Sequence, residues 1–126
     1  MANEITVTAA LAVSNGNYVS SWAPGVKTYD QTAAGGPWPG VVSIGTSEEP
    51  VDPDSGTLTS LATEGWMMMQ NLDASNYVQW GFATGVYGGR MEAGETAGPF
   101  RLEPGAVLYL LANTAVCDVR IEVYED

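Results

Sequence analysis

The chain has 126 residues, of which 45% are apolar and 15% are charged, and its formal net charge is −11. Length and composition are typical of one globular domain with a buried core. The sequence has no histidine and four basic residues, which excludes histidine-based nucleophilic catalysis and the commonest zinc ligand, and argues against a basic surface that grips nucleic acid.

The N-terminal segment alternates apolar and less apolar positions with a period of two. The apolar odd positions are Ile5, Val7, Ala9, Leu11 and Val13. This alternation predicts a strand with one face in a core. Asn15-Gly16 follows directly and predicts a hairpin, because both residues tolerate positive φ.

Pro-Gly pairs divide the rest of the chain. They lie at Pro24-Gly25, Pro39-Gly40 and Pro104-Gly105, and each predicts a turn that starts a new strand, because proline fixes φ and glycine supplies positive φ. The strands expected after the first one are 26–31, 41–46, 65–73, 77–82, 100–102, 106–113 and an alternating segment from Cys117 to Val123. About eight strands separated by turns predict an all-β fold: a single antiparallel, jelly-roll-like β-sandwich over 1–126, as one domain.

Three stretches read as irregular: 33–40, 84–98 and the acidic segment 47–56. The acidic segment contains Glu48, Glu49, Asp52 and Asp54. Its spacing does not fit an EF-hand loop, in which glycine stands at position six and glutamate at position twelve. We expect a solvated loop, with a cation site as the alternative, and no cofactor.

Nothing in the sequence has the form of a catalytic motif. Fifteen acidic residues make some carboxylate pair inevitable, so the pairing that glycoside hydrolysis needs carries no specificity here. Cys117, the only cysteine, falls on the inward side of its strand and is expected to be a small buried apolar residue. The sequence therefore predicts a protein that is not an enzyme.

The cysteine count and the chain start favour a cytoplasmic site of synthesis. A single cysteine forms no internal disulfide, which favours folding in a reducing compartment. The first residues lack the basic stretch of a signal peptide. The longest apolar run, 106–112, is far shorter than the ~20 residues of a membrane helix, so no membrane partner is expected.

Two expected strands are apolar on both faces, which predicts contact with another subunit. In 65–73, Trp66 and Met68 face one way while Met67 and Met69 face the other; 106–111 shows the same pattern around Tyr109. A two-layer sandwich has no second interior for such strands, and Met and Trp are enriched at interfaces. We therefore expect Trp66, Met67, Met69 and Tyr109 to bury apolar area against a neighbour; the alternative is that the chain's own domain covers both faces of these strands.

Two further tryptophans, Trp22 and Trp38, lie beside Pro-Gly pairs. A loop tryptophan can anchor a partner, cover the end of a sandwich, or stack on a sugar. The spacing leaves these three roles open. Anchor and lid rank equally, and a sugar platform ranks third.

The segments 71–81, 99–105 and 110–115 together resemble small structural proteins of tailed bacteriophages. They combine a strand that ends in an Asn71-Leu72-Asp73 turn, an amide-rich second strand and a Pro-Gly turn that feeds an apolar strand. The resemblance covers 65–126. It implies a virion protein made in the host cytoplasm, most simply a capsid decoration (cement) protein without catalytic residues.

On this interpretation the partners are copies of the chain itself, with a trimer favoured, and the major capsid protein. The net charge of −11 would repel packaged DNA and favours the outside of a shell or a tail position over one that lines the DNA. The alternative is a tail or fibre component whose Trp22, Trp38 and acidic loop form a glycan-binding site.

Overall fold

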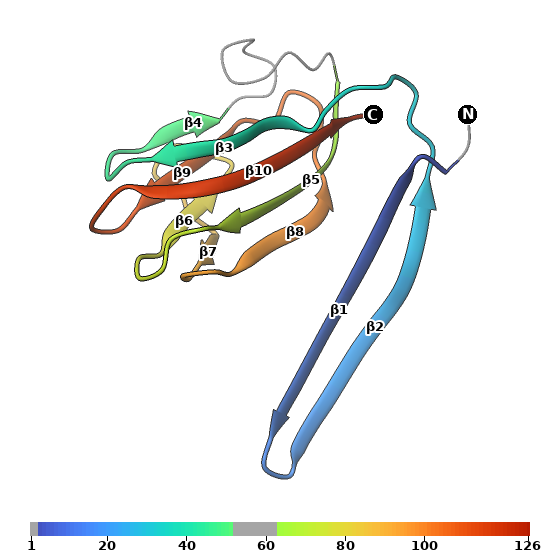
Figure 1. Ribbon diagram of the computed structural model, residues 1–126, viewed down its shortest axis with the longest axis horizontal. Coiled ribbons are helices and arrows are strands. Elements are labelled where there is room, and N and C mark those ends of the chain that lie inside the picture. The colour runs from blue at the N-terminus through green and yellow to red at the C-terminus, as the bar shows by residue number, and fades with distance from the viewer. Residues whose placement is uncertain (1–2, 52–62) are drawn as a thin grey trace. The chain divides into compact units, whose positions relative to one another are not determined.

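The computed structural model describes residues 3–51 and 63–126, and these form ten strands in three antiparallel sheets without a helix (Figure 1). The chain divides into two compact units, Met1–Thr32 and Ala33–Asp126. The predicted antiparallel all-β class is confirmed. One sandwich of about eight strands over 1–126 is not, because the first two strands form a sheet of their own.

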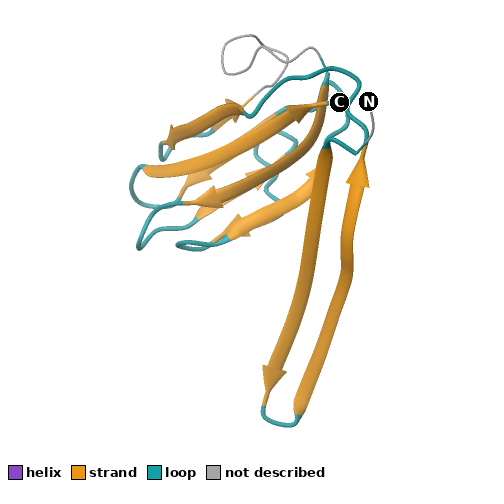
Figure 2. Cartoon of the chain, turned by 45° about the vertical axis from the view of Figure 1, so that its right-hand side comes forward, coloured by secondary structure: helices purple, strands orange, loops and turns teal. Residues whose placement is uncertain are grey.

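The first unit is a long β-hairpin of β1 (Ile5–Asn15) and β2 (Tyr18–Tyr29) (Figure 2). Asn15 lies opposite Tyr18, so the loop consists of two residues. Gly16 stands at its first position with φ of +58°, the conformation that a type II′ hairpin turn requires. The predicted first strand and hairpin are confirmed, but the loop is Gly16-Asn17, one residue later than the predicted Asn15-Gly16, because Asn15 still pairs within the strand.

Pro24-Gly25 does not make the predicted turn. Both residues lie within β2, where the register shifts: Ala9 is opposite Gly25, while Leu11 is opposite Trp22. The extra residue on β2 is a β-bulge, and Gly25 has φ of +91°. A bulge leaves a residue unpaired, so a proline without an N–H group is tolerated there and the strand continues.

The second unit consists of two four-stranded sheets. One sheet has the order β3-β10-β5-β8, formed by Trp38–Ile44, Cys117–Glu125, Glu64–Asn71 and Thr96–Arg101. The other has the order β4-β9-β6-β7, formed by Glu49–Val51, Leu108–Ala112, Val78–Gly81 and Gly89–Met91.

The pairings in the second unit are nested. The first strand pairs with the last (β3 with β10), the second with the second-last (β4 with β9), and so inward through β5 with β8 to β6 with β7. Two further pairings, β5 with β10 and β6 with β9, join these pairs into the two sheets. The unit is therefore one long antiparallel ribbon folded over on itself.

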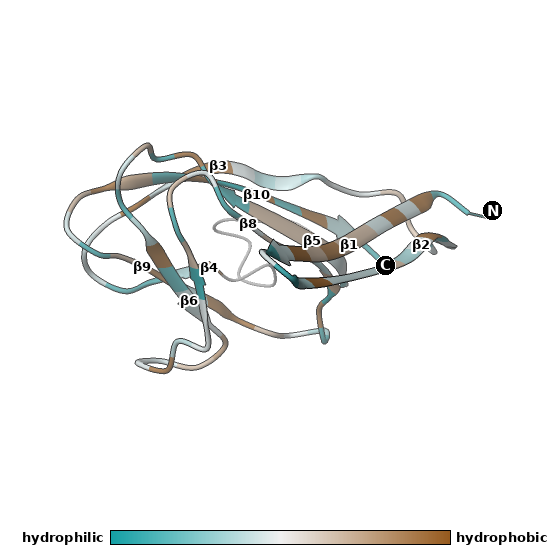
Figure 3. Ribbon diagram, turned by 90° about the horizontal axis from the view of Figure 1, so that it is seen from below, coloured by the Kyte–Doolittle hydropathy of each residue, from teal (hydrophilic) through white to brown (hydrophobic). Residues whose placement is uncertain are grey.

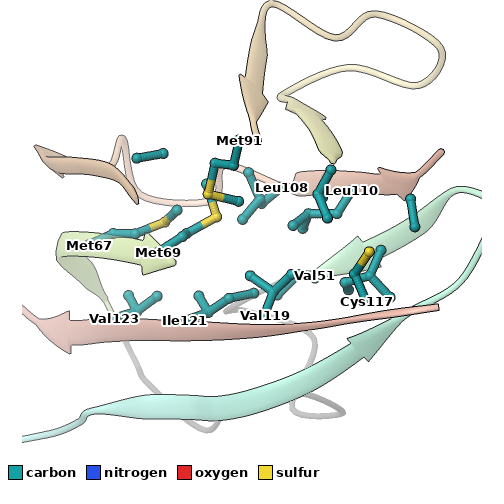
Figure 4. Close-up of a cluster of buried hydrophobic side chains, with 14 of the residues drawn as sticks. Val51, Met67, Met69, Met91, Leu108, Leu110, Cys117, Val119, Ile121 and Val123 are labelled. Atoms are coloured by element: carbon teal, nitrogen blue, oxygen red, sulfur yellow. The ribbon is translucent and has the colours of Figure 1, made fainter. Parts of the chain in front are cut away.

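The buried core lies between the two sheets (Figure 4). The inward side of β10 supplies the positions that the sequence alternation predicts, and opposing side chains come from β9 and β7. The labelled core residues are Val51, Met67, Met69, Met91, Leu108, Leu110, Cys117, Val119, Ile121 and Val123. All core residues of the described chain belong to the second unit, whose architecture is sandwich-like.

The other two Pro-Gly pairs behave differently from each other. Pro104-Gly105 forms the predicted turn: the N–H of Ala106 donates to the carbonyl oxygen of Glu103 at 3.0 Å, and Gly105 has φ of +83°. Pro39-Gly40 instead lies in β3, paired with the C-terminal strand. Tertiary pairing extends that strand back to Trp38, through residues that were expected to be irregular.

Two of the expected irregular stretches also contain strands. The stretch 84–98 holds β7 and the beginning of β8, so it is not the long excursion expected from its glycines. In the acidic stretch, Glu49–Val51 forms β4. Asp52 and Asp54 lie outside the described residues.

Candidate interaction surface

One face of the hairpin gathers its aromatic side chains. Directly opposed residues of an antiparallel pair share a face, and the register opposes Leu11 to Trp22, Ile5 to Tyr29 and Asn15 to Tyr18. We define the hairpin apolar face by its large residues. They are Ile5, Val7, Leu11, Val13, Tyr18, Trp22 and Tyr29, and the one charged residue of the two strands, Lys27, lies among them opposite Val7.

The bulge creates this face. Tyr18 and Trp22 have even numbers and Tyr29 has an odd one, so in a regular strand Tyr29 would point to the opposite side from the other two. The one extra residue near Pro24 reverses the alternation between Trp22 and Gly25. All three aromatic side chains of the hairpin therefore lie on one side.

The opposite face of the hairpin is different in character. It carries mainly small and hydroxyl side chains, and its larger apolar residues are Val19 and Val26; the rest include Thr6, Thr8, Ala12, Ser14, Ser21 and Thr28. The alternation of hydrophobic and less hydrophobic residues is visible along β1 (Figure 3). The hairpin therefore has two faces of unequal hydrophobicity.

The hairpin apolar face is exposed, contrary to the prediction that it lies in a core. Leu11 and Trp22 are 74% and 70% exposed, and Tyr18 and Val13 are exposed as well. Only toward the open end of the hairpin do Ile5, Val7 and Tyr29 become half-buried. A hollow of about 300 Å³ lies along this surface, lined by Leu11, Ala12, Val13, Tyr18, Ser20 and Trp22.

Charge is distributed unequally between the two units. Within the two hairpin strands, Lys27 is the single charged residue, whereas thirteen of the fifteen acidic residues follow Thr32. The large negative charge of the chain thus belongs to the second unit. The hairpin is nearly uncharged.

Met67 and Met69 are not available to a partner, which corrects the prediction that they form an interface. Their side chains are 2% and 1% exposed and lie in the core between the sheets. The sequence correctly separates the two faces of this strand. It does not show which side of the strand points into the core, because both sides carry large apolar residues.

Trp66 and Tyr109 lie on the outward sides of two different sheets and are half-buried there. The guanidinium of Arg101 lies over the Trp66 ring, 5.3 Å from its centroid. Tyr109 has Pro50 and Gly81 as its cross-strand neighbours. Neighbours within each sheet thus cover part of both rings, and the structure does not bring the two together.

Trp22 and Trp38 belong to different units. Trp38 opens β3 opposite Val123 and is exposed.

An aromatic cluster that the sequence analysis missed packs against the core. The rings of Trp80 and Phe100 are stacked, with centroids 5.8 Å apart, and Phe82 meets both edge-on. Gly89 lies against the Trp80 ring, where a side chain would collide with it. In the structure, Gly89 lies directly opposite Trp80 on the neighbouring strand. This pairing would have indicated the cluster, but the sequence does not reveal it, because it depends on the register between the two strands.

The side chain of Glu48, in the acidic stretch, forms hydrogen bonds with other residues of the second unit. Its carboxylate accepts hydrogen bonds from the Tyr87 hydroxyl and from the N–H of Gly85, and these bonds lower the pKa of Glu48 below its ordinary value, the tyrosine bond having the larger effect. Glu49 accepts from the N–H of Gly45. In the described ranges, no three His, Cys, Asp or Glu side chains group together as metal ligands.

The turn that follows β5 is stabilised by its own polar side chains. The buried Asn71 amide donates to the carbonyl oxygens of Asn76, Met91 and Glu92 at 2.8–3.2 Å. The Asp73 carboxylate accepts from the backbone N–H groups of Ser75 and Asn76. The residues that carry the phage resemblance therefore perform a structural role here.

Comparison with known proteins gives no match. No family model, curated protein or solved structure matches the chain. Nothing in these comparisons links it to phage proteins.

Within residues 3–51 and 63–126, the structure contains no helix with the length and apolarity needed to span a bilayer.

Proposed function

We propose that this chain is a non-enzymatic structural protein of a virion, a capsid decoration protein that binds the outside of the shell and bridges its subunits. The hairpin apolar face carries the proposal, because a two-stranded hairpin without a core of its own is at best marginally stable in water. A hairpin that keeps Leu11 and Trp22 exposed gains stability by packing on a partner. Assembly is the function that this arrangement serves.

We infer that the second unit, Ala33–Asp126, is an eight-stranded jelly roll. The nested pairing of β3 with β10 through β6 with β7 supports this, since a jelly roll is an antiparallel ribbon rolled into two sheets. Jelly rolls occur in viral capsid proteins, and also in lectins and cupins. The fold is compatible with the proposal, and the hairpin supplies the specific argument.

The charge distribution supports a position on the outside of the particle. The acidic second unit would repel packaged DNA, while the nearly uncharged hairpin can approach another protein surface without that repulsion. Repetition over a shell lattice converts modest individual contacts into strong retention. The chain would thus be held by the hairpin, with its acidic unit toward solvent.

The proposal is tested by adding the purified full chain to shells that lack it. We expect the chain to sediment with the shells, to appear on their outer surface in electron micrographs, and to raise the temperature at which they rupture. A chain that is found only on tails, or that stays in the supernatant, contradicts the proposal.

A glycan-binding tail or fibre module is the second candidate, and the exposure of Trp22 is the observation that favours it. Titration of the full chain with oligosaccharides, followed by tryptophan fluorescence, separates the two. We expect no saturable change. A saturable change that Trp22→Ser abolishes, with no binding to shells, would replace decoration by glycan recognition.

A further inference from the structure

We propose that the hairpin apolar face is a homotypic interface: it packs against the same face of a second copy of this chain. The inference rests on the proposed function, since it names the first partner of the surface on which that function depends. The sequence analysis expected Met67 and Met69 to contact a neighbouring subunit, but both are buried in the core. The hairpin apolar face takes their place as the proposed surface for self-association.

The charge distribution favours contact between two copies through the hairpin apolar face over contact through other faces of the molecule. Two second units that approach each other bring carboxylates together, and like charges at an interface oppose association. The hairpin strands contain Lys27 as their one charged residue. Contact through the hairpins is therefore the arrangement in which two copies of a chain of charge −11 meet with least repulsion.

The extent of the face sets the size of the interface. Six cross-strand pairs, twelve residues, lie on this face, fewer than the about 20–30 residues that a standard interface uses on each side, so the homotypic contact belongs to the smaller class of interfaces. Association of identical surfaces requires that a face present both projections and hollows. This face does so, with the rings of Tyr18 and Trp22 bordering a hollow of about 300 Å³.

The structure offers a matched pair of variants. Leu11 and Trp22 lie on the hairpin apolar face and are 74% and 70% exposed, while Val19 and Val26 lie on the opposite face and are 69% and 62% exposed. Both pairs are apolar, exposed and carried by the same two strands. Replacement of Leu11 and Trp22 removes large apolar side chains from the proposed interface. Replacement of Val19 and Val26 changes only the opposite face of the hairpin.

The test measures the mass of the full chain in solution, without shells, by light scattering and sedimentation at about 100 μM, a concentration high enough to populate a small interface as well. We expect a dimer or a trimer. Leu11→Ser with Trp22→Ser should weaken self-association by at least about 30-fold, the range that loss of central interface residues reaches. Val19→Ser with Val26→Ser should change it by less than about 3-fold.

Two further readouts make the outcome decisive. Hydrogen exchange should be slow in the hairpin strands of the assembled chain and fast in the Leu11→Ser/Trp22→Ser variant, with the second unit protected in both. Raising the salt concentration should leave association unchanged or strengthen it, because salt screens the repulsion between copies. A monomer at this concentration, or equal weakening by both variant pairs, overturns the inference.

Failure of this inference is distinguishable from failure of the proposed function. A chain that is monomeric alone but still binds shells through the hairpin keeps its decoration role and loses the homotypic interface. A chain that self-associates through the hairpin and ignores shells retains the interface and loses the decoration role.

Discussion

At the scale of single residues, the turn after β5 shows how polar side chains fix the second unit. Asn71 is fully buried, and its amide joins the end of its own strand to Asn76 and to the end of β7. Burial of such a group is favourable only when its hydrogen bonds are made. Asp73 then closes the turn with a carboxylate that accepts from two backbone N–H groups.

The Asp73 carboxylate predicts a specific pH dependence. Hydrogen bonds from the N–H groups of Asn76 and then Ser75 lower its pKa below the ordinary 3.8. Its contribution to stability is therefore present above the pKa of the unfolded chain and is lost as pH falls through the lower pKa of the folded protein. Asp73→Asn should lower the urea unfolding midpoint at pH 7, and the midpoints of the variant and the unchanged chain should converge as pH falls through the pKa of Asp73 in the folded protein.

Glu103→Gln is the control for this prediction, because it removes the same charge from an exposed residue before a turn. In a chain of charge −11, loss of one negative charge alone should be neutral or slightly stabilising. Equal destabilisation by both variants, or a difference that does not depend on pH, would show that the turn hydrogen bonds are not its source.

At the scale of the element, β5 and the hairpin show that an apolar residue acquires its role from what covers it. Met69 and Met68 are adjacent and chemically identical, yet they are 1% and 43% exposed. In the hairpin, Leu11 follows the same alternation as the core positions of β10, but no sheet lies over it within the first unit. Full burial of a large apolar side chain contributes about 1.5–3 kcal/mol to the stability of the fold. Only side chains on a covered face make this contribution.

The adjacent methionines give a direct comparison. Met69→Ala should lower the free energy of unfolding by about 2–5 kcal/mol, because it leaves a cavity between the two sheets. Met68→Ala, on the outward side of the same strand, should change it by less than about 1 kcal/mol. Chemical denaturation of both variants measures the difference, and similar losses would contradict the assignment of the two faces.

At the scale of the whole molecule, the described core belongs to one of the two units. Every residue of the described core lies in Ala33–Asp126, and the hairpin contributes none. A two-stranded sheet has no opposing layer to bury its apolar side, whereas the second unit has two sheets that cover each other. The second unit therefore covers its own apolar faces, whereas the first leaves most of its apolar face exposed.

This division predicts the behaviour of the chain without its first 32 residues. The fragment 33–126 should fold, and its thermal midpoint should lie within about 4 °C of that of the dilute full chain, which corresponds to less than about 1 kcal/mol. Its midpoint should not depend on concentration, whereas that of the full chain should rise with concentration as copies associate. Calorimetry over a range of concentrations checks both, and an unfolded fragment would contradict the division.

Sequence alone was sufficient where a signal is local. The alternation from Cys117 to Val123, the Gly16 turn and the Pro104-Gly105 turn each depend on a few neighbouring residues, and each has the expected structure. The other Pro-Gly pairs carry the same local signal but lie inside strands. Pairing with a partner strand decided that the chain continues as a strand at both positions, with a bulge at Pro24-Gly25, and no short segment contains that information.

Tertiary structure alone decided which apolar faces are covered. A period of two shows that a strand has two faces, and composition shows that both faces of β5 are apolar. Which face is buried depends on the position of a second sheet, and the aromatic face of the hairpin exists because one unpaired residue of β2 reverses its alternation. Alternation is a property of one strand, whereas burial is a property of all the segments packed around it, so the exposed apolar face could not be identified before the fold was known.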